Sequence, residues 1–304
     1  MKKSVSFLPV MALSVAFFAA CSDDSSSGSN PSATDLGQSS SSTDLQVPTS
    51  SDITPNSSSD IAPSSSSAAP EVPETVNPAD IVLDEAGFAD IQYVYRSLQP
   101  NEKAIFLLRH AERTSSVKKT APLTEDGEEQ ALSVGRKLVG NDEFTFTHTD
   151  FTRTYLTCQN IAIGRGQATF PNDTNDTFTE AWYISNDSLL KEYSKNPSSS
   201  NMVISNWSYT GEFADAFYDF NTKNEEMLNL LMSYYATPSR VKVICSHDNF
   251  LVPLTVYLTN KAVNLRLYED NKKWLNYLAG VAIITSDTGE RRIYAIKGLD
   301  SGVR

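Results

Sequence analysis

Two histidines of this sequence stand directly after apolar, strand-like segments. The first segment, residues 104–110, reads AIFLLRH, and the second, residues 241–248, reads VKVICSHD. In an open parallel sheet the ligand-binding crevice lies at the carboxyl ends of the strands. If the two segments are neighbouring strands, we expect His110 and His247 to face one pocket.

Charged side chains accompany both histidines. Arg109 and Arg113 flank the first, and Asp248 follows the second. Another arginine, Arg153, stands in the first turn of a predicted helix between them. Arginine is planar and permanently charged, which suits it to phosphate oxygens. Since a neutral imidazole can attack phosphorus while an acid protonates the leaving oxygen, these residue types indicate phosphoryl transfer through a phosphohistidine.

Hydrophobic periodicity predicts the elements around the first histidine. Its own segment is apolar at successive positions, which is typical of a central parallel strand buried on both faces. Helical spacing precedes it over residues 84–98. After it, Thr124 is a candidate N-cap, and Glu125 and Asp126 would lie in the first turn of a helix that ends near Gly140.

The rest of the chain continues this pattern up to an irregular stretch. We predict a strand over 144–149, helices over 152–163, 224–235 and 250–258, and a hairpin of strands 279–285 and 291–296 around Asp287-Thr288-Gly289. Between residues 164 and 221 the periodicity is poor, and Asn, Asp, Thr, Ser and aromatic residues are abundant. We expect a loop-rich helical insertion there that covers the site.

The first quarter of the chain is predicted to lie outside the folded domain, which we place at residues 79–304. Residues 1–20 have a charged start and an apolar stretch that ends in small residues, as secretory signals do. The following Cys21 resembles the lipidated residue of bacterial lipoproteins, and secretion without a lipid is the alternative. Residues 21–78 are Ser-rich and too poor in apolar residues to fold, so we expect a disordered tether.

Composition bears on several other functions. The 304-residue chain carries a net charge of −12, which argues against nucleic-acid binding, because such proteins usually present a basic face. No metal-ligand spacing occurs in the sequence, so we expect neither a catalytic metal nor a cofactor.

Cys158 and Cys245 lie in apolar segments and are predicted core residues, with a disulfide between them as the alternative. For His148 a structural role is predicted over a substrate contact.

Four blocks of the sequence resemble the histidine phosphatase superfamily, also called phosphoglycerate-mutase-like, in the expected order. Residues 109–113, RHAER, are similar to its Arg-His-Gly block, with Ala111 in place of glycine. Residues 123–131 are similar to its Leu-Thr-x-x-Gly-x-x-Gln-Ala helix start. Residues 153–158, RTYLTC, resemble Arg-Ala-x-Gln-Thr-Ala without the glutamine, and residues 246–249, SHDN, resemble the His-Asp block of the acid phosphatase branch.

The resemblance implies an α/β fold with a mostly parallel central sheet and helices on both faces. It also implies a phosphohistidine at His110 and a phosphate pocket made of Arg109, Arg113, Arg153 and His247. The spacing of Arg113 and the SHDN block favour the acid phosphatase branch, in which Asp248 would be the proton donor. Glu180 is the alternative donor, because the mutase-like branch takes a glutamate from this region. We prefer Asp248.

These observations lead us to expect a metal-independent phosphomonoesterase that acts on small organic phosphates outside the cytoplasm. A lipid would anchor it in the cell envelope, and Ser22 is compatible with the outer membrane. A phosphomutase of the same fold is one alternative, although a secreted enzyme would rarely meet glycolytic intermediates. Another is a catalytically silent lipoprotein that binds a phosphorylated or acidic glycan, which intact Arg109, His110, His247 and Asp248 argue against.

The anchor can be tested by a single substitution. Cys21→Ser removes the thiol that would carry the lipid, so the variant should move from the membrane fraction to the soluble fraction. Fractionation followed by immunoblotting measures this. A variant that still pellets with membranes as the wild-type protein does would contradict lipidation at Cys21.

Overall fold

The apolar run before His110 forms the strand β2 (Glu102–Arg109), and the run before His247 forms β5 (Val241–Ser246). These strands are parallel neighbours, and their register pairs Arg109 with Ser246. The residues that follow these strands therefore lie side by side at the carboxyl ends of the strands. This confirms the expectation drawn from the two apolar segments.

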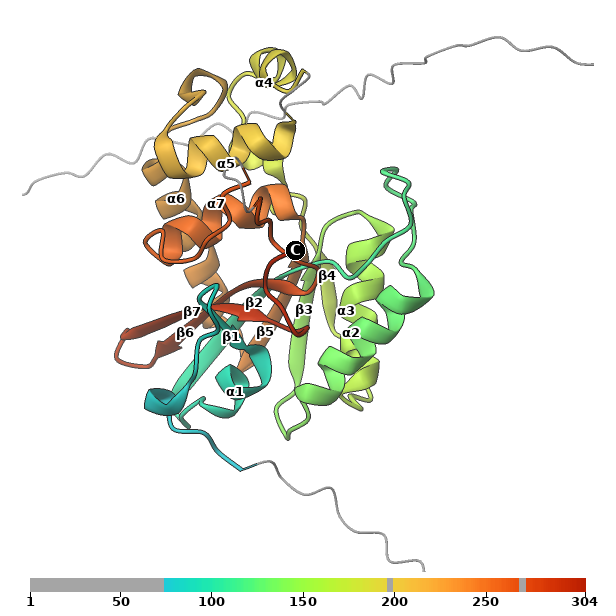
Figure 1. Cartoon of the computed structure of the whole chain (residues 1–304). Coiled ribbons are helices and arrows are strands. Elements are labelled where there is room, and N and C mark those ends of the chain that lie inside the picture. The colour runs from blue at the N-terminus through green and yellow to red at the C-terminus, as the bar shows by residue number, and fades with distance from the viewer. Residues whose placement is uncertain (1–73, 196–198, 268–271) are drawn as a thin grey trace, which may run out of the picture. The chain divides into compact units, whose positions relative to one another are not determined.

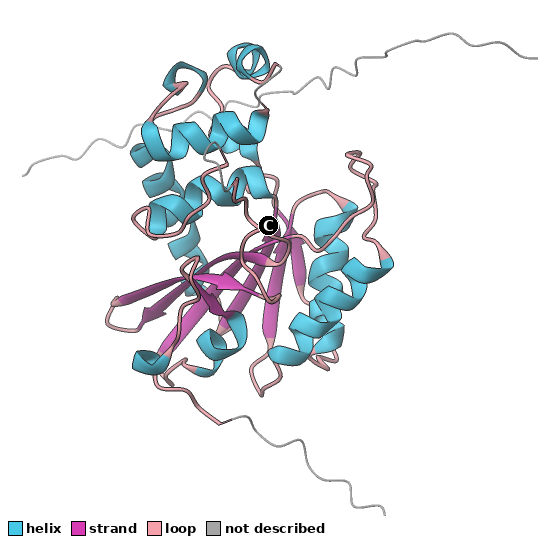
Figure 2. Cartoon of the chain, in the orientation of Figure 1, coloured by secondary structure: helices cyan, strands magenta, loops and turns pink. Residues whose placement is uncertain are grey.

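In the computed structural model, residues 74–195, 199–267 and 272–304 are described. They form a seven-stranded sheet with helices on both faces, an α/β architecture (Figures 1 and 2). The strand order is β1 (Phe88–Asp90), β7 (Arg291–Lys297), β6 (Ala279–Ser286), β2, β5, β3 (Phe144–His148) and β4 (Asn172–Thr174). Only β6 runs antiparallel to its neighbours, so the sheet is mostly parallel.

Alternate residues of β2 belong to separate cores on the two faces of the sheet. Ile105 and Leu107 pack with one group of helices, and Phe106 and Leu108 pack with the other. The first group comprises α4 (Asp187–Tyr193), α5 (Ser200–Thr210), α6 (Phe220–Ser233) and α7 (Asp248–Leu258), and the second comprises α1 (Ile91–Arg96), α2 (Glu125–Lys137) and α3 (Thr152–Gly164). None of the described helices is both long and apolar enough to span a membrane.

One predicted segment differs from the structure. The single helix expected over 84–98 is a strand followed by a helix, because Phe88–Asp90 pairs with β7 and the Asp90 side chain caps α1 by accepting from Gln92 N. The insertion between 164 and 221 contains the helices α4 and α5 as well as loops, as predicted. Its aromatic residues join the core on one face of the sheet, and the rings of Trp207 and Phe217 stack there, 4.3 Å apart.

Other predicted features are confirmed. The Thr124 hydroxyl accepts from Gly127 N and caps α2, and Gly289 has a φ of 85° in the turn between β6 and β7. Cys158 and Cys245 are buried free thiols. The candidate signal, Cys21 and the tether up to residue 73 lie outside the described residues. At the tether's predicted end, the Val76 amide donates to the carbonyl of Arg96.

The start of α2 fixes the loop that follows β2. The carbonyl oxygen of Glu112 accepts a hydrogen bond from Thr124 N at 3.1 Å. A Cβ atom placed on Gly127 would overlap that same carbonyl. Glycine is needed here because the loop carrying His110 and Arg113 crosses the helix at backbone contact distance.

Substitution of Gly127 by alanine tests this contact, because the change in unfolding free energy should have the opposite sign to that at an ordinary helix position. Glycine to alanine in a helix ordinarily gains about 1 kcal/mol. Here we expect Gly127→Ala to lose roughly 1–3 kcal/mol of unfolding free energy, because the methyl group is forced against backbone. Denaturant unfolding measures it, with Glu128→Ala at the adjacent exposed position as control. A stabilised Gly127→Ala variant would show that the loop does not lie against this helix.

Candidate active site

His110 directly follows β2 and is buried. Its Nδ1 lies 2.7 Å from the carbonyl oxygen of Ala111, which can only accept, so Nδ1 carries the proton. Burial lowers the pKa of His110 well below its ordinary value, and the charge of Arg109 and the neighbouring His247 lower it further. A neutral ring with its proton on Nδ1 leaves the Nε2 lone pair available for attack.

Two hydrogen bonds hold the backbone at this histidine in place. The Ala111 amide donates to the hydroxyl oxygen of Thr157 on α3 at 3.0 Å, and His110 N donates to the carbonyl of Ser246 on β5 at 2.9 Å. The backbone at Ala111, the position where the similar motif has glycine, is therefore fixed by a hydrogen bond to α3. The Ala111 side chain is buried in the core formed with α2 and α3.

His247 stands between β5 and α7, and its ring centroid lies 5.6 Å from that of His110. Its Nδ1 is 3.4 Å from a guanidinium nitrogen of Arg153, and its Nε2 is 3.0 Å from the Thr149 hydroxyl. Because arginine can only donate, Nδ1 accepts and Nε2 carries the proton. Burial, followed by the charge of Arg153, lowers the pKa of His247 to about 3.

The three predicted arginines reach the same place from three segments. Arg109, at the end of β2, is buried and forms a 2.8 Å ion pair with Asp248. Arg153 lies in the first turn of α3, with its guanidinium 4.2 Å from the ring centroid of Phe151. The Arg113 guanidinium is held over the following loop by the carbonyl oxygens of Thr114 and Ser116.

The two candidate acids have opposite environments. Both carboxylate oxygens of Asp248 are occupied: one accepts from Arg109 and from Trp274 Nε1 at 2.9 Å, and the other from Asn249 N. Burial raises the pKa of Asp248, but Arg109 and these hydrogen bonds outweigh burial and lower it overall. Glu180 begins a short 3-10 helix in the insertion, and burial, with the Asp248 charge adding to it, raises its pKa.

All of these side chains line one cavity of ≈ 340 Å³. It holds every residue predicted for phosphate chemistry: Arg109, His110, Arg113, Arg153, Glu180, His247 and Asp248. Six more residues complete its lining: Val117, Phe151, Asn201, Asn249, Tyr277 and Arg304. Asn249 could have been found, since it belongs to the SHDN block, whereas Tyr277 and Arg304 lie in segments without any motif.

His148, the remaining histidine of the chain, lies outside this cavity. His148 packs against Tyr155, and its ring nitrogens contact Thr149 O and the Asn172 side chain, which is a structural environment. Among the residues that the structure describes, no group of three or more His, Cys, Asp or Glu side chains is arranged to hold a metal ion.

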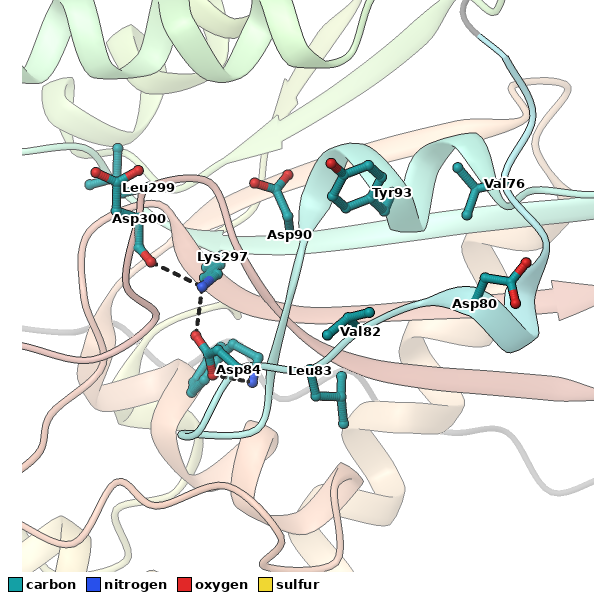
Figure 3. Close-up of a pocket in the computed structure, with 11 residues that line it drawn as sticks. Val76, Asp80, Val82, Leu83, Asp84, Asp90, Tyr93, Lys297, Leu299 and Asp300 are labelled. Atoms are coloured by element: carbon teal, nitrogen blue, oxygen red, sulfur yellow. Dashed lines mark hydrogen bonds and ion pairs between the residues drawn. The ribbon is translucent and has the colours of Figure 1, made fainter.

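A larger cavity of ≈ 540 Å³ at the β1 edge of the sheet has a different lining (Figure 3). Lys297 Nζ donates there to the Asp84 carboxylate at 2.7 Å and to the carbonyl of Asp300 at 2.9 Å. None of the described residues that line it is a histidine or an arginine. The groups suited to phosphoryl transfer are therefore gathered in the smaller cavity.

Fold and site together define an α/β protein with two histidines and an arginine cluster at the carboxyl ends of its parallel strands. Residues 105–293 match the model of the histidine phosphatase superfamily (branch 1). The chain belongs to the histidine phosphatase superfamily. Arg113 and the SHDN block suggested a closer relationship to the acid phosphatase branch. That relationship stays a prediction.

Phosphatases and a mutase are among the similar solved structures. A phosphoglycerate mutase from Bacillus anthracis is 14% identical over 64% of this chain and 92% of its own, with a TM-score of 0.44. A mycobacterial glucosyl-3-phosphoglycerate phosphatase is 13% identical over 64% of this chain and 99% of its own, with a TM-score of 0.42. No curated protein matched the sequence.

Proposed function

We propose that this protein is a metal-independent phosphomonoesterase that forms a phosphohistidine at His110. The observation that carries the proposal is the hydrogen bond from His110 Nδ1 to the Ala111 carbonyl. It leaves an unprotonated Nε2 on a neutral ring among cavity-lining arginines. A nucleophile needs that lone pair, and a phosphoryl group needs those cations.

The reaction follows in two steps. In the first, Arg109, Arg113 and Arg153 hold the phosphoryl oxygens while His110 Nε2 forms a bond to phosphorus and the bond to the ester oxygen breaks. The leaving oxygen takes a proton from an acid, and the alcohol departs. In the second step the same acid, now a base, removes a proton from water, whose oxygen displaces the imidazole and releases inorganic phosphate.

We infer that this acid is Glu180 rather than Asp248, which the sequence favoured. A general acid must carry a proton, and burial promotes protonation of Glu180. Asp248 is held ionised by Arg109, and none of its oxygens is without a hydrogen bond. The role that suits Asp248 is to orient Arg109 and to balance its charge beside the nucleophile.

The site of action belongs to the same proposal. The signal-like residues 1–20 and the lipoprotein-like Cys21 support an enzyme tethered to the cell envelope, with its catalytic domain outside the cytoplasm. Substrates there would be organic phosphate esters small enough for a cavity of ≈ 340 Å³.

Replacement of the nucleophile is the first test. His110→Ala should lower phosphate release from p-nitrophenyl phosphate by several orders of magnitude and abolish acid-labile, base-stable labelling of the protein. His148→Asn removes the histidine outside the cavity and should keep both. Wild-type activity should also survive EDTA. Substantial turnover by His110→Ala would indicate another nucleophile, and loss on chelation with recovery on adding metal would contradict the metal-free mechanism.

A second test identifies the acid by its dependence on the leaving group. An alkoxide needs a proton to leave, whereas p-nitrophenolate needs little help. Glu180→Gln should therefore slow an alkyl phosphate at least tenfold more than p-nitrophenyl phosphate, while Asp248→Asn should slow both to a similar extent through misplaced Arg109.

The pH profile gives an independent readout of the same assignment. Because Glu180 must be protonated to donate, wild-type activity on the alkyl ester should fall as pH rises through the elevated pKa of Glu180. Glu180→Gln should lose this limb of the profile. Leaving-group dependence in Asp248→Asn instead would return the donor role to Asp248.

A further inference from the structure

Arg304 lines the catalytic cavity although it belongs to none of the family motifs. Its backbone exchanges two hydrogen bonds with Trp274, of 3.1 and 2.9 Å. An antiparallel bridge between Leu275 and Val303 continues this pairing. Main-chain hydrogen bonds therefore hold Arg304 in position, and its side chain is available to bind a ligand.

Tyr277 connects Arg304 to the reaction centre. The guanidinium of Arg304 lies 4.7 Å from the centroid of the Tyr277 ring, and that of Arg109 lies 4.3 Å from it. The same ring is 5.8 Å from the ring of His110. Arg304 is thus one aromatic ring away from the nucleophile, at a place that an ester's leaving group could reach.

The charges of the cavity exceed what one phosphoryl group requires. Asp248 pairs with Arg109, but in the described part of the chain no carboxylate forms an ion pair with Arg113, Arg153 or Arg304. A phosphoryl dianion balances two of these three cations. One guanidinium is left without an ion-paired carboxylate or a phosphoryl charge to balance it, and Arg304 is the one outside the phosphate-binding motifs.

We propose that Arg304 determines specificity by binding a second anionic group on the leaving group of the substrate. The substrate class is then a phosphomonoester whose alcohol carries a carboxylate or a second phosphate. This inference rests on the proposed phosphomonoesterase function and adds the chemistry of the leaving group. A guanidinium can bind either anion through paired hydrogen bonds.

The experiment compares esters that differ only in the charge at the far end of the leaving group. Propyl phosphate carries none, 3-aminopropyl phosphate a positive one, 3-phosphonooxypropanoate a carboxylate, and propane-1,3-diyl bisphosphate a second phosphate. We expect wild-type kcat/KM to be about tenfold or more higher for at least one of the two anionic esters than for propyl phosphate, since charge-assisted hydrogen bonds are the strong ones. The difference between these two esters identifies the preferred anion.

Substitutions then assign the preference to one side chain. Arg304→Gln should reduce the ratio of anionic to uncharged ester to near one, and Arg304→Glu should favour the 3-aminopropyl ester. Arg291→Gln, at an exposed arginine of β7, is the control and should keep the wild-type ratio. Equal melting temperatures for all variants would show that the fold is retained, as the backbone pairing with Trp274 predicts.

The outcomes separate the two proposals. If the wild-type enzyme hydrolyses all four esters without preferring either anionic one, the second anion is refuted and the phosphatase function stands. A preference that persists in Arg304→Gln would exclude Arg304 as its source. If no ester is hydrolysed, the proposed function itself fails, and the inference fails with it.

Discussion

The parallel pairing of β2 with β5 is the interaction on which the candidate active site depends. Its register sets Arg109 opposite Ser246 and so brings the next residues, His110 and His247, to a ring separation of 5.6 Å. A slip of one residue would move one histidine along the strand by about 3.3 Å. The apolar cores on both faces of the sheet oppose such a slip, because it would exchange the faces of every β2 side chain.

The placement of the two histidines also affects the pKa values of the groups in the cavity. Burial depresses the pKa of both histidine rings, and the neighbouring arginines depress it further, so the proposed phosphate-binding cations also favour a neutral ring at His110. Asp248 offsets one cation without accepting a proton, since Arg109 holds it ionised. Burial instead raises the pKa of Glu180 in the same cavity, which makes Glu180 the carboxyl group better suited to carry a proton.

The sequence predicted most of the candidate site because most of its residues stand at or just beyond an end of a periodic element. Strand ends located His110 and His247, and a helix start located Arg153. The roles of Asp248 and Glu180 depend on burial and on partners such as Trp274, which no local pattern encodes. Tyr277 and Arg304 were missed for a similar reason: they enter through a pairing of irregular segments. The strand Phe88–Asp90 was hidden because its partner, β7, lies two hundred residues away.

The division of the site between regular elements and irregular segments has a physical consequence for the proposed enzyme. In the proposed mechanism, the regular elements β2, β5 and α3 position the groups that would contact the phosphoryl moiety, which is the same in every phosphomonoester. The insertion supplies Glu180 and Asn201 to the cavity, and the paired segments near Trp274 supply Tyr277 and Arg304, so these parts would surround the leaving group. Changes there can alter the substrate while the strand register that creates the nucleophile stays intact. In the proposed enzyme the sheet therefore positions the reacting groups, and the irregular segments that line the cavity would determine selectivity.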